Sequence, residues 1–376
     1  MSLIYLIAGE QSGDVLGGRL MHAIKTRRPD MAFAGIGGAA MAAQGLVSLF
    51  PIRNLSLMGL LEIVPRLLQL KALLRRTVAD IEARLPDVVV TIDSPGFTLR
   101  VLRALQPTSL RRAHYVAPQV WAWRESRVKH YPGLWDTLLC LLPFEPAFFA
   151  GHGLPARFVG HPVLESGAET GNADRFRSVH AVPAEAKVVT IMPGSRQTEV
   201  SRLLPILEET LRRLPDRIVP VVPLAGPVEA VVRQRTTSWP IRPILVTGAA
   251  AKHDAFAAST AALTKSGTSS LELALANVPM LVTYQVNPLS AWIAMRSVRV
   301  KYASLLNLLL DRPVVPELLQ QNSRPALLAD TLHRLLNDPA AVAEQRQGFA
   351  EALAMLRPAA GTPSEYAAEA VLSMMQ

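Results

Sequence analysis

Short apolar runs rich in β-branched residues alternate along this chain with longer segments of helical spacing, and no other feature restricts the fold as strongly. Runs such as Leu3–Ala8 and Met280–Tyr284 are too short for buried helices and are typical of strands that are covered on both faces. A helix-like segment follows the first run over residues 15–27. This order predicts an α/β fold built on parallel sheets. The further strand candidates are residues 32–36, 87–92, 114–116, 137–142, 157–159, 188–192, 218–222, 244–247 and 261–264.

The alternation of strands and helices stops and starts again near the middle of the chain. Residues 161–172 contain one proline and two glycines, and we interpret them as a linker. The 376 residues are enough for two domains of ordinary size. We therefore expect two Rossmann-like domains, residues 1–165 and 173–356, with parallel sheets that face a central cleft, where such sheets bind ligands. A last helix, residues 364–376, is expected to pack back on an N-terminal domain.

Charge and composition narrow the classes of partner. The 39 Lys and Arg residues outnumber the 30 Asp and Glu residues, and the net charge of +9 favours anionic partners. A hydrophobic content of 50% excludes disorder. The single cysteine, Cys140, excludes an intrachain disulfide and a zinc site built on several thiolates. Because we find neither a signal peptide nor a long apolar run, we expect a cytoplasmic protein that is soluble or peripheral on a membrane.

The first candidate binding turn follows the first strand. Gly9 and Gly13 permit a tight backbone there, and Ser12 or Asp14 can cap the helix that follows. Free amides at a helix start suit an anion. A capped turn without a ligand explains the same residues equally well.

A second candidate turn for an anion follows a strand in the second half of the chain. Gly194, Ser195 and Arg196 follow the strand at residues 188–192, and the arginine adds a fixed charge that suits a diphosphate. The alternative is a surface arginine on a loop.

A third turn carries hydroxyls and a glycine between a strand and a helix. It contains Ser266, Gly267 and Thr268, and the nearby Glu272 is placed to accept hydrogen bonds from ribose hydroxyls. The same segment reads as a capping box between Ser269 and Glu272, and the sequence does not separate the two interpretations.

A candidate general base, Asp93, follows the strand at residues 87–92 and precedes Ser94, Pro95 and Gly96. A carboxylate at this end of a buried strand faces the expected cleft and can remove a proton from an attacking hydroxyl. The alternative is a turn-capping aspartate of the Asx type. The histidines are scattered, and none has metal-ligand spacing, so no metal is expected.

Residues 56–74 combine many leucines with cations that continue to Arg75 and Arg76. Such a helix can lie in a membrane interface with its cations near lipid phosphates, and residues 292–301 have similar character. An ordinary helix buried between domains or subunits is the alternative. A nucleic-acid surface is disfavoured because the cations alternate with Leu and Ile rather than with stacking aromatics.

Taken together, these segments resemble the lipid-A-disaccharide synthase family of inverting glycosyltransferases with the GT-B fold. The matching stretches are residues 8–14 (AGEQSGD), 92–97 (IDSPGF), 114–124 (HYVAPQVWAWR), 142–145 (LPFE), 158–162 (FVGHP), 193–200 (PGSRQTEV) and 266–268 (SGT). The resemblance runs in order from about residue 3 to about residue 320.

The resemblance implies that UDP-2,3-diacylglucosamine donates its sugar to the 6-hydroxyl of 2,3-diacylglucosamine 1-phosphate. A β-1,6 disaccharide phosphate forms and UDP leaves, at the cytoplasmic face of a bacterial inner membrane. Asp93 is then the general base, with Glu10 as a second candidate carboxylate and Arg196 stabilising the leaving diphosphate. The resemblance also implies that Asn307, Glu317 and Gln320 bind the nucleotide, that no metal or other cofactor takes part, and that the protein is a homodimer.

Two alternatives remain. The protein can be another UDP-sugar enzyme of the same architecture, such as an epimerase or a peptidoglycan glycosyltransferase, because such an enzyme needs the same phosphate-binding turns. It can also be a non-catalytic, basic protein on the membrane surface, which would explain the positive charge and the leucine-rich helix.

Overall fold

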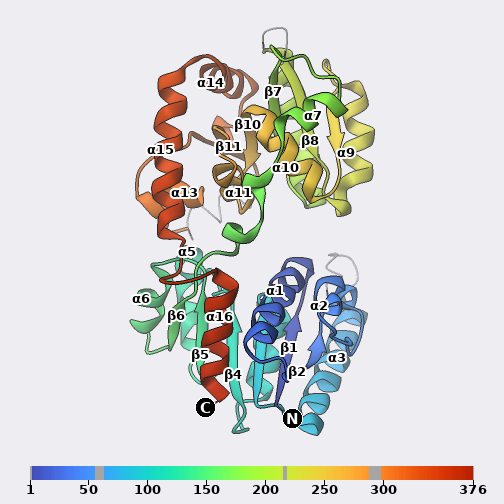
Figure 1. The fold of residues 1–376 in the computed structure, drawn as a ribbon, viewed down its shortest axis with the longest axis vertical. Helices are drawn as coiled ribbons and strands as arrows, with labels where there is room; N and C mark the ends of the chain where they lie inside the picture. The colour runs from blue at the N-terminus through green and yellow to red at the C-terminus, as the bar shows by residue number, and fades with distance from the viewer. Residues whose placement is uncertain (1, 56–62, 215–217, 288–297, 376) are drawn as a thin grey trace. The chain divides into compact units, whose positions relative to one another are not determined.

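The computed structural model describes residues 2–55, 63–214, 218–287 and 298–375 (Figure 1). The chain divides into two compact units, one formed by Met1–Pro162 with Leu356–Gln376 and the other by Val163–Met355. Among the described residues each unit holds one six-stranded parallel sheet with helices packed on it. The expected α/β fold class is confirmed.

The sheet of the first unit has the strand order β2-β1-β3-β4-β5-β6. Its strands are β1 (Leu3–Ala8), β2 (Ala32–Ile36), β3 (Val88–Ile92), β4 (Arg111–Tyr115), β5 (Thr137–Cys140) and β6 (Ala156–Phe158). Its helices are α1 (Gln11–Arg27), α2 (Ala39–Ala43), α3 (Ile63–Arg84), α4 (Pro95–Ala104), α5 (Val120–Trp123), α6 (Glu145–Ala150) and α16 (Pro363–Leu372).

Alternation along the central strands creates three layers in this unit. Ile4 and Leu6 point into one core, which they share with side chains of α1 and α16. Tyr5 and Ile7 point to the opposite face, where α3 and α4 cover them. Both faces are therefore apolar, which is why the strands read as continuous hydrophobic runs.

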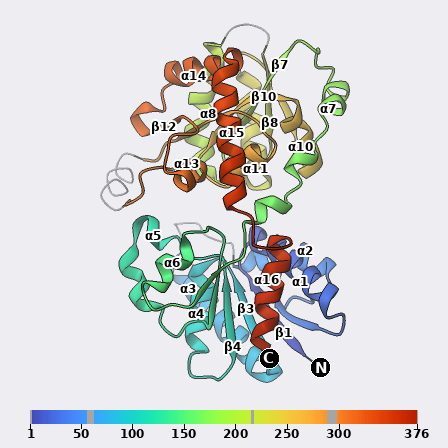
Figure 2. The same ribbon diagram turned by 60° about the vertical axis from the view of Figure 1, so that its left-hand side comes forward.

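The chain end returns to the first unit as α16, which packs along α1 (Figures 1 and 2). Thr362 and Glu365 form a capping box at the start of this helix, and Pro363 occupies its first turn. The helix buries Ala367, Ala368 and Val371 in the same core as β1.

The sheet of the second unit has the order β12-β11-β10-β7-β8-β9, which is the Rossmann strand order. Its strands are β7 (Lys187–Met192), β8 (Ile218–Pro223), β9 (Ile244–Val246), β10 (Ser259–Lys265), β11 (Met280–Tyr284) and β12 (Glu317–Leu319). Its helices are α7 (Ala173–Val179), α8 (Gln197–Arg212), α9 (Glu229–Arg235), α10 (Ala249–Ala258), α11 (Ser269–Leu275), α13 (Leu305–Leu310), α14 (Pro325–Asn337) and α15 (Pro339–Met355).

The predicted linker, residues 161–172, belongs mostly to the second unit. The backbone amide of Asn172 donates to Asp254 Oδ1 at 2.8 Å, and Arg175 forms two hydrogen bonds with the same carboxylate. These contacts fix the end of the segment to α10.

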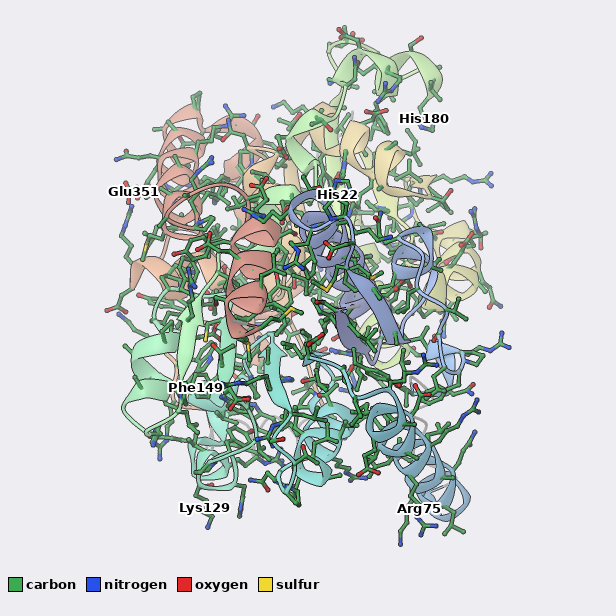
Figure 3. All side chains as sticks on the ribbon, turned by 60° about the horizontal axis from the view of Figure 1, so that its bottom comes forward. His22, Arg75, Lys129, Phe149, His180 and Glu351 are labelled. Atoms are coloured by element: carbon green, nitrogen blue, oxygen red, sulfur yellow. The ribbon has the colours of Figure 1, made fainter. Side chains whose placement is uncertain are left out.

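The leucine-rich, basic stretch forms part of α3, although residues 56–62 lie outside the described residues. Leu70, Leu73 and Leu74 pack against the core of the first unit, so this part of the helix is partly a core element. Leu68, by contrast, is 68% exposed. Arg75 projects away from the unit (Figure 3).

The second stretch of this character, residues 292–301, lies mostly outside the described residues. In the described part of the chain, no helix has the length and apolarity needed to cross a membrane.

Candidate active site

In each sheet the order of the strands reverses between two neighbours, β1 and β3 in the first unit and β7 and β10 in the second. Sheets of this kind bind ligands beyond the carboxyl ends of the strands at such a reversal. The turns that follow these four strands contain most of the residues that the sequence singles out. Each unit therefore has its own candidate site.

In the first unit the turns after β1 and β3 lie in direct contact. Ala8 and Ile92 are register partners at the ends of the two strands. A Cβ placed on Gly9 would lie 2.3 Å from both Cβ and Oγ of Ser94. Only glycine leaves room for this approach, so Gly9 brings Glu10 to the turn that carries Asp93.

The backbone around Asp93 has an unusual conformation. Asp93 and Ser94 have φ angles of 49° and 46°, in the left-handed region that non-glycine residues rarely adopt. The Asp93 amide donates to the Tyr115 carbonyl at 2.8 Å, and Thr98 Oγ1 donates to the Asp93 carbonyl at 2.6 Å. Such strained positions cluster at functional sites. These hydrogen bonds fix the Asp93 backbone at the edge of the sheet.

The Asp93 carboxyl group has a raised pKa. Burial is the main cause, the charge of Glu10 is the second, and a hydrogen bond between the two carboxyl groups adds to both. A hydrogen bond from the Ser94 backbone opposes the shift, and this contact also matches the turn-capping alternative. Ser12 Oγ donates to Glu10 Oε1 at 3.0 Å. A carboxyl group whose pKa moves toward neutrality is better suited to take a proton from a sugar hydroxyl.

The structure gives Asp14 hydrogen bonds and Gly13 a close packing contact inside the first unit. The buried Asp14 carboxylate accepts hydrogen bonds from the amides of Gly38, Ala40 and Met41, which stand at the start of α2. Gly13 lies within α1, where an added Cβ would meet the Ile92 carbonyl at 3.4 Å. Their predicted role in substrate binding remains a prediction.

In the second unit a cavity of about 340 Å³ opens at the ends of β7 and β10. Gly194, Ser195 and Glu272, all predicted from the sequence, line it. Gly194 has a φ of 116°, and an added Cβ would lie 2.7 Å from Glu199 Oε2, so the turn needs glycine. Ser269 lines the cavity at the start of α11.

The turn of Ser266, Gly267 and Thr268 connects β10 to α11. Thr268 occupies the N-cap position of α11 without a side-chain cap, so the capping box between Ser269 and Glu272 is absent. Glu272 instead accepts a hydrogen bond from Lys252 Nζ at 2.8 Å. The capping-box interpretation is wrong for this segment, because an ion pair across the cavity holds the carboxylate.

Three charged residues of this site were not assigned from the sequence. Lys252 and Lys265 both line the cavity, and the buried Glu199 lies beneath the turn at Gly194. Lys265 directly precedes Ser266 and could have been found by its position at the end of a strand. Lys252 comes from α10, and no local pattern predicts that it would reach Glu272.

Two of the three residues carried over from the family resemblance, Asn307 and Glu317, form one network near β12. Glu317 accepts hydrogen bonds from the amides of Ala303 and Ser304 at 2.9 Å and from Asn307 Nδ2 at 2.7 Å. Ser266 Oγ donates to the Ala303 carbonyl at 2.7 Å, which joins this network to the turn after β10.

Asn307 itself is buried and binds the backbone of Val315. Gln320 has a φ of 49°, and its Oε1 accepts from the Val286 amide. The structure thus places Asn307 and Glu317 where they shape the loop beside Ser266.

No group of three or more His, Cys, Asp or Glu side chains within the described ranges is arranged to hold a metal ion.

Solved structures of low sequence identity share the fold. The UDP-GlcNAc 2-epimerase of Neisseria meningitidis, solved with UDP-GlcNAc bound, matches with a TM-score of 0.68 at 12% identity and covers 99% of this chain and 100% of its own. The calicheamicin glycosyltransferase CalG4 matches with a TM-score of 0.59 at 16% identity, covering 100% of this chain and 98% of its own. These likenesses show the fold, which is the expected GT-B class.

Curated relatives are much closer in sequence. The lipid-A-disaccharide synthase of Gluconobacter oxydans is 55% identical over 99% of this chain and 91% of its own length. The enzyme of the same name from Pseudomonas aeruginosa is 42% identical over 99% of this chain and 98% of its own. A family model described as lipid-A-disaccharide synthetase matches residues 4–371. The chain belongs to this family of glycosyltransferases.

Proposed function

We propose that the protein transfers the sugar of UDP-2,3-diacylglucosamine to the 6-hydroxyl group of 2,3-diacylglucosamine 1-phosphate. The products are the β-1,6 disaccharide 1-phosphate and UDP. Family membership supports the reaction. The observation that carries the proposal is the close contact of the turns after β1 and β3 at the strand reversal of the first unit, where burial and the charge of Glu10 raise the pKa of Asp93.

Asp93 acts as the general base. As the acceptor oxygen attacks the anomeric carbon, its O–H bond breaks and the proton passes to the Asp93 carboxylate. The bond between the anomeric carbon and the diphosphate oxygen breaks on the opposite side, so the configuration inverts. Glu10 raises the proton affinity of Asp93 through its charge and its hydrogen bond.

The cavity of the second unit binds the nucleotide. The turns at Gly194–Arg196 and Ser266–Thr268 receive the diphosphate, and Glu272 accepts hydrogen bonds from the ribose hydroxyls. The leaving diphosphate gains negative charge, which Arg196 and the backbone amides of these turns stabilise in the transition state. The proposed reaction needs no metal, because these groups supply the positive charge.

Peripheral attachment to the cytoplasmic face of the inner membrane fits the acylated substrates. The exposed Leu68 and the cations Lys71 and Arg75 of α3 are suited to an anionic lipid surface. Replacing Leu68 with serine should reduce sedimentation with anionic vesicles while the circular dichroism stays unchanged. If the variant and the wild type sediment equally, α3 does not contact the membrane.

We also propose that the protein is a homodimer. Light scattering at micromolar concentration tests this, and a monomer mass would refute it.

The experiment that tests the function incubates the purified protein with both acylated substrates in EDTA and identifies the product by mass spectrometry. Disaccharide 1-phosphate and UDP in equal amounts are expected. An isomerised UDP-sugar without disaccharide would favour the epimerase alternative. Vesicle binding without turnover would favour a non-catalytic lipid-binding protein.

A further inference from the structure

We propose that Lys265 is a second cation for the diphosphate beside Arg196, and that the buried Glu199 is the positioning residue that holds both. This inference rests on the proposed function, because it specifies the chemistry of the phosphate end of the same cavity. Nothing in the sequence motifs or in the family comparison assigns either residue a role.

The ion pair of Lys265 and Glu199 connects the two turns that we assign to the diphosphate. Lys265 ends β10, Glu199 lies in the first turn of α8, and the two strands that lead into them are neighbours in the sheet. Lys265 Nζ lies 3.3 Å from Glu199 Oε1 and 3.4 Å from a Cβ placed on Gly267. Glu199 Oε2 lies 2.7 Å from a Cβ placed on Gly194. The pair therefore lies against both glycine turns.

Burial gives the two members of the pair different tasks. The Glu199 side chain is 6% exposed, and its buried Oε2 atom has no hydrogen-bond partner within the described ranges of the chain. Because the carboxylate is so deeply buried, we expect a ligand in the cavity to contact the cations and not Glu199. The Lys265 side chain is 15% exposed and lines the cavity. Glu199 thus acts through the cations, whereas Lys265 can contact a ligand.

At the phosphate end of the cavity the positive charges outnumber the negative ones, so the site can bind an anion. Arg196 Nη1 and Lys265 Nζ both approach Glu199 Oε1, at 3.2 and 3.3 Å, so one carboxylate faces two cations. The Arg196 side chain is 75% exposed and is screened by water, but the Lys265 ammonium is largely desolvated. A charge interaction strengthens as the local dielectric constant falls. Lys265 should therefore contribute strongly to diphosphate binding.

Lys252 is the matched control. It lines the same cavity, its side chain is 23% exposed, and it too is paired with a carboxylate, Glu272, at 2.8 Å. In our assignment Glu272 binds ribose, so Lys252 affects the nucleoside end. The two lysines should differ in how they discriminate a nucleotide from a nucleoside.

The test measures the affinities of the full-length protein for UDP and for uridine, by calorimetry and ligand-observed NMR. Lys265→Met should weaken UDP binding about tenfold or more, which corresponds to about 1.4 kcal/mol, and leave uridine binding within about twofold. Lys252→Met should weaken both ligands by a similar factor. Equal losses for both ligands in Lys265→Met, or no loss of UDP binding, would overturn the proposal.

Two further variants keep the test decisive if Lys265→Met folds poorly. Lys265→Arg keeps the charge and should retain UDP binding within a few fold of the wild type. Glu199→Gln keeps an acceptor for both cations but removes the opposing charge, so UDP should bind more tightly while uridine binding is unchanged. Glu199→Gln with an unchanged ratio of UDP to uridine affinity would show that Glu199 is only structural. Wild-type protein that binds neither ligand would instead refute the proposed function.

Discussion

Replacing Gly9 with alanine tests the contact that brings the two turns of the first unit together. The added Cβ would lie 2.3 Å from Cβ and Oγ of Ser94, whereas carbon atoms normally approach to about 3.5–4.0 Å. Ser94, or the turn after β1, must therefore move by about 1 Å. Asp93 precedes Ser94 directly, and a misplacement of about 1 Å can lower turnover about 100-fold. The same overpacking should lower the free energy of unfolding by roughly 1–3 kcal/mol.

The chain supplies both a control and a rescue for this variant. Gly151→Ala in the same unit places its Cβ at 3.4 Å or more from its neighbours, and its φ of −59° suits alanine, so turnover should stay near normal and stability should not fall. Ser94→Gly removes the atoms that Gly9→Ala would strike and suits the φ of 46° at this position. If the two substitutions acted independently, the losses of stability of the single variants would add. The double variant Gly9→Ala/Ser94→Gly should instead be more stable than that sum by roughly 1–3 kcal/mol.

The assays are the rate of disaccharide formation at saturating substrates and urea unfolding, for the wild type, the three single variants and the double variant. Normal turnover in Gly9→Ala would contradict the reasoning. So would a double variant whose losses equal the sum of those of the single variants, because the close contact would then not be their cause.

Three further predictions concern titration and charge. Burial is the main cause of the raised Asp93 pKa, and Glu10→Gln removes the charge that adds to it and offers an N–H donor to the ionised carboxylate, so the acid limb of the kcat/KM profile should move to lower pH; an unmoved limb would show that the two groups are not coupled. Burial raises the pKa of Glu145 to about 7, so the folded state binds more protons than the unfolded state, and this group's contribution to the free energy of unfolding should fall as the pH rises from about 4.5 to 7. Urea titrations of Glu145→Ala across that range should lack this decline, and a decline equal to that of the wild type would refute the assignment. Arg196→Ala should weaken UDP binding about tenfold without changing uridine binding, and calorimetry that finds equal UDP affinity would exclude the contact.

The short apolar runs of the sequence predicted the strands well, because buried parallel strands are short, rich in β-branched residues and often bounded by glycine or proline. β1, β2 and β11 coincide with the predicted ranges, and most of the other ends differ by one to three residues. β12 was missed because its three residues, Glu317–Leu319, give no periodicity.

The candidate turns were predictable because the chemistry of each turn is local. The contacts that decide the role of a side chain join distant parts of the chain. Asp14 was expected as one of two candidate caps of its own helix, but α1 has no side-chain cap, and Asp14 accepts from amides at the start of α2. Its role in substrate binding stays a prediction. Likewise, Glu272 was ambiguous until its ion pair with Lys252 was known. Register and long-range packing set such pairs, and a single sequence does not show them.

The most direct test of the central claim compares wild type and Asp93→Asn for disaccharide formation in EDTA, with UDP affinity measured on the same samples. The account predicts a loss of turnover of roughly 10²- to 10⁴-fold with UDP binding unchanged, since the base is lost while the nucleotide site of the second unit stays intact. Turnover within a few fold of the wild type would contradict it and would leave Asp93 as a residue that only shapes its turn.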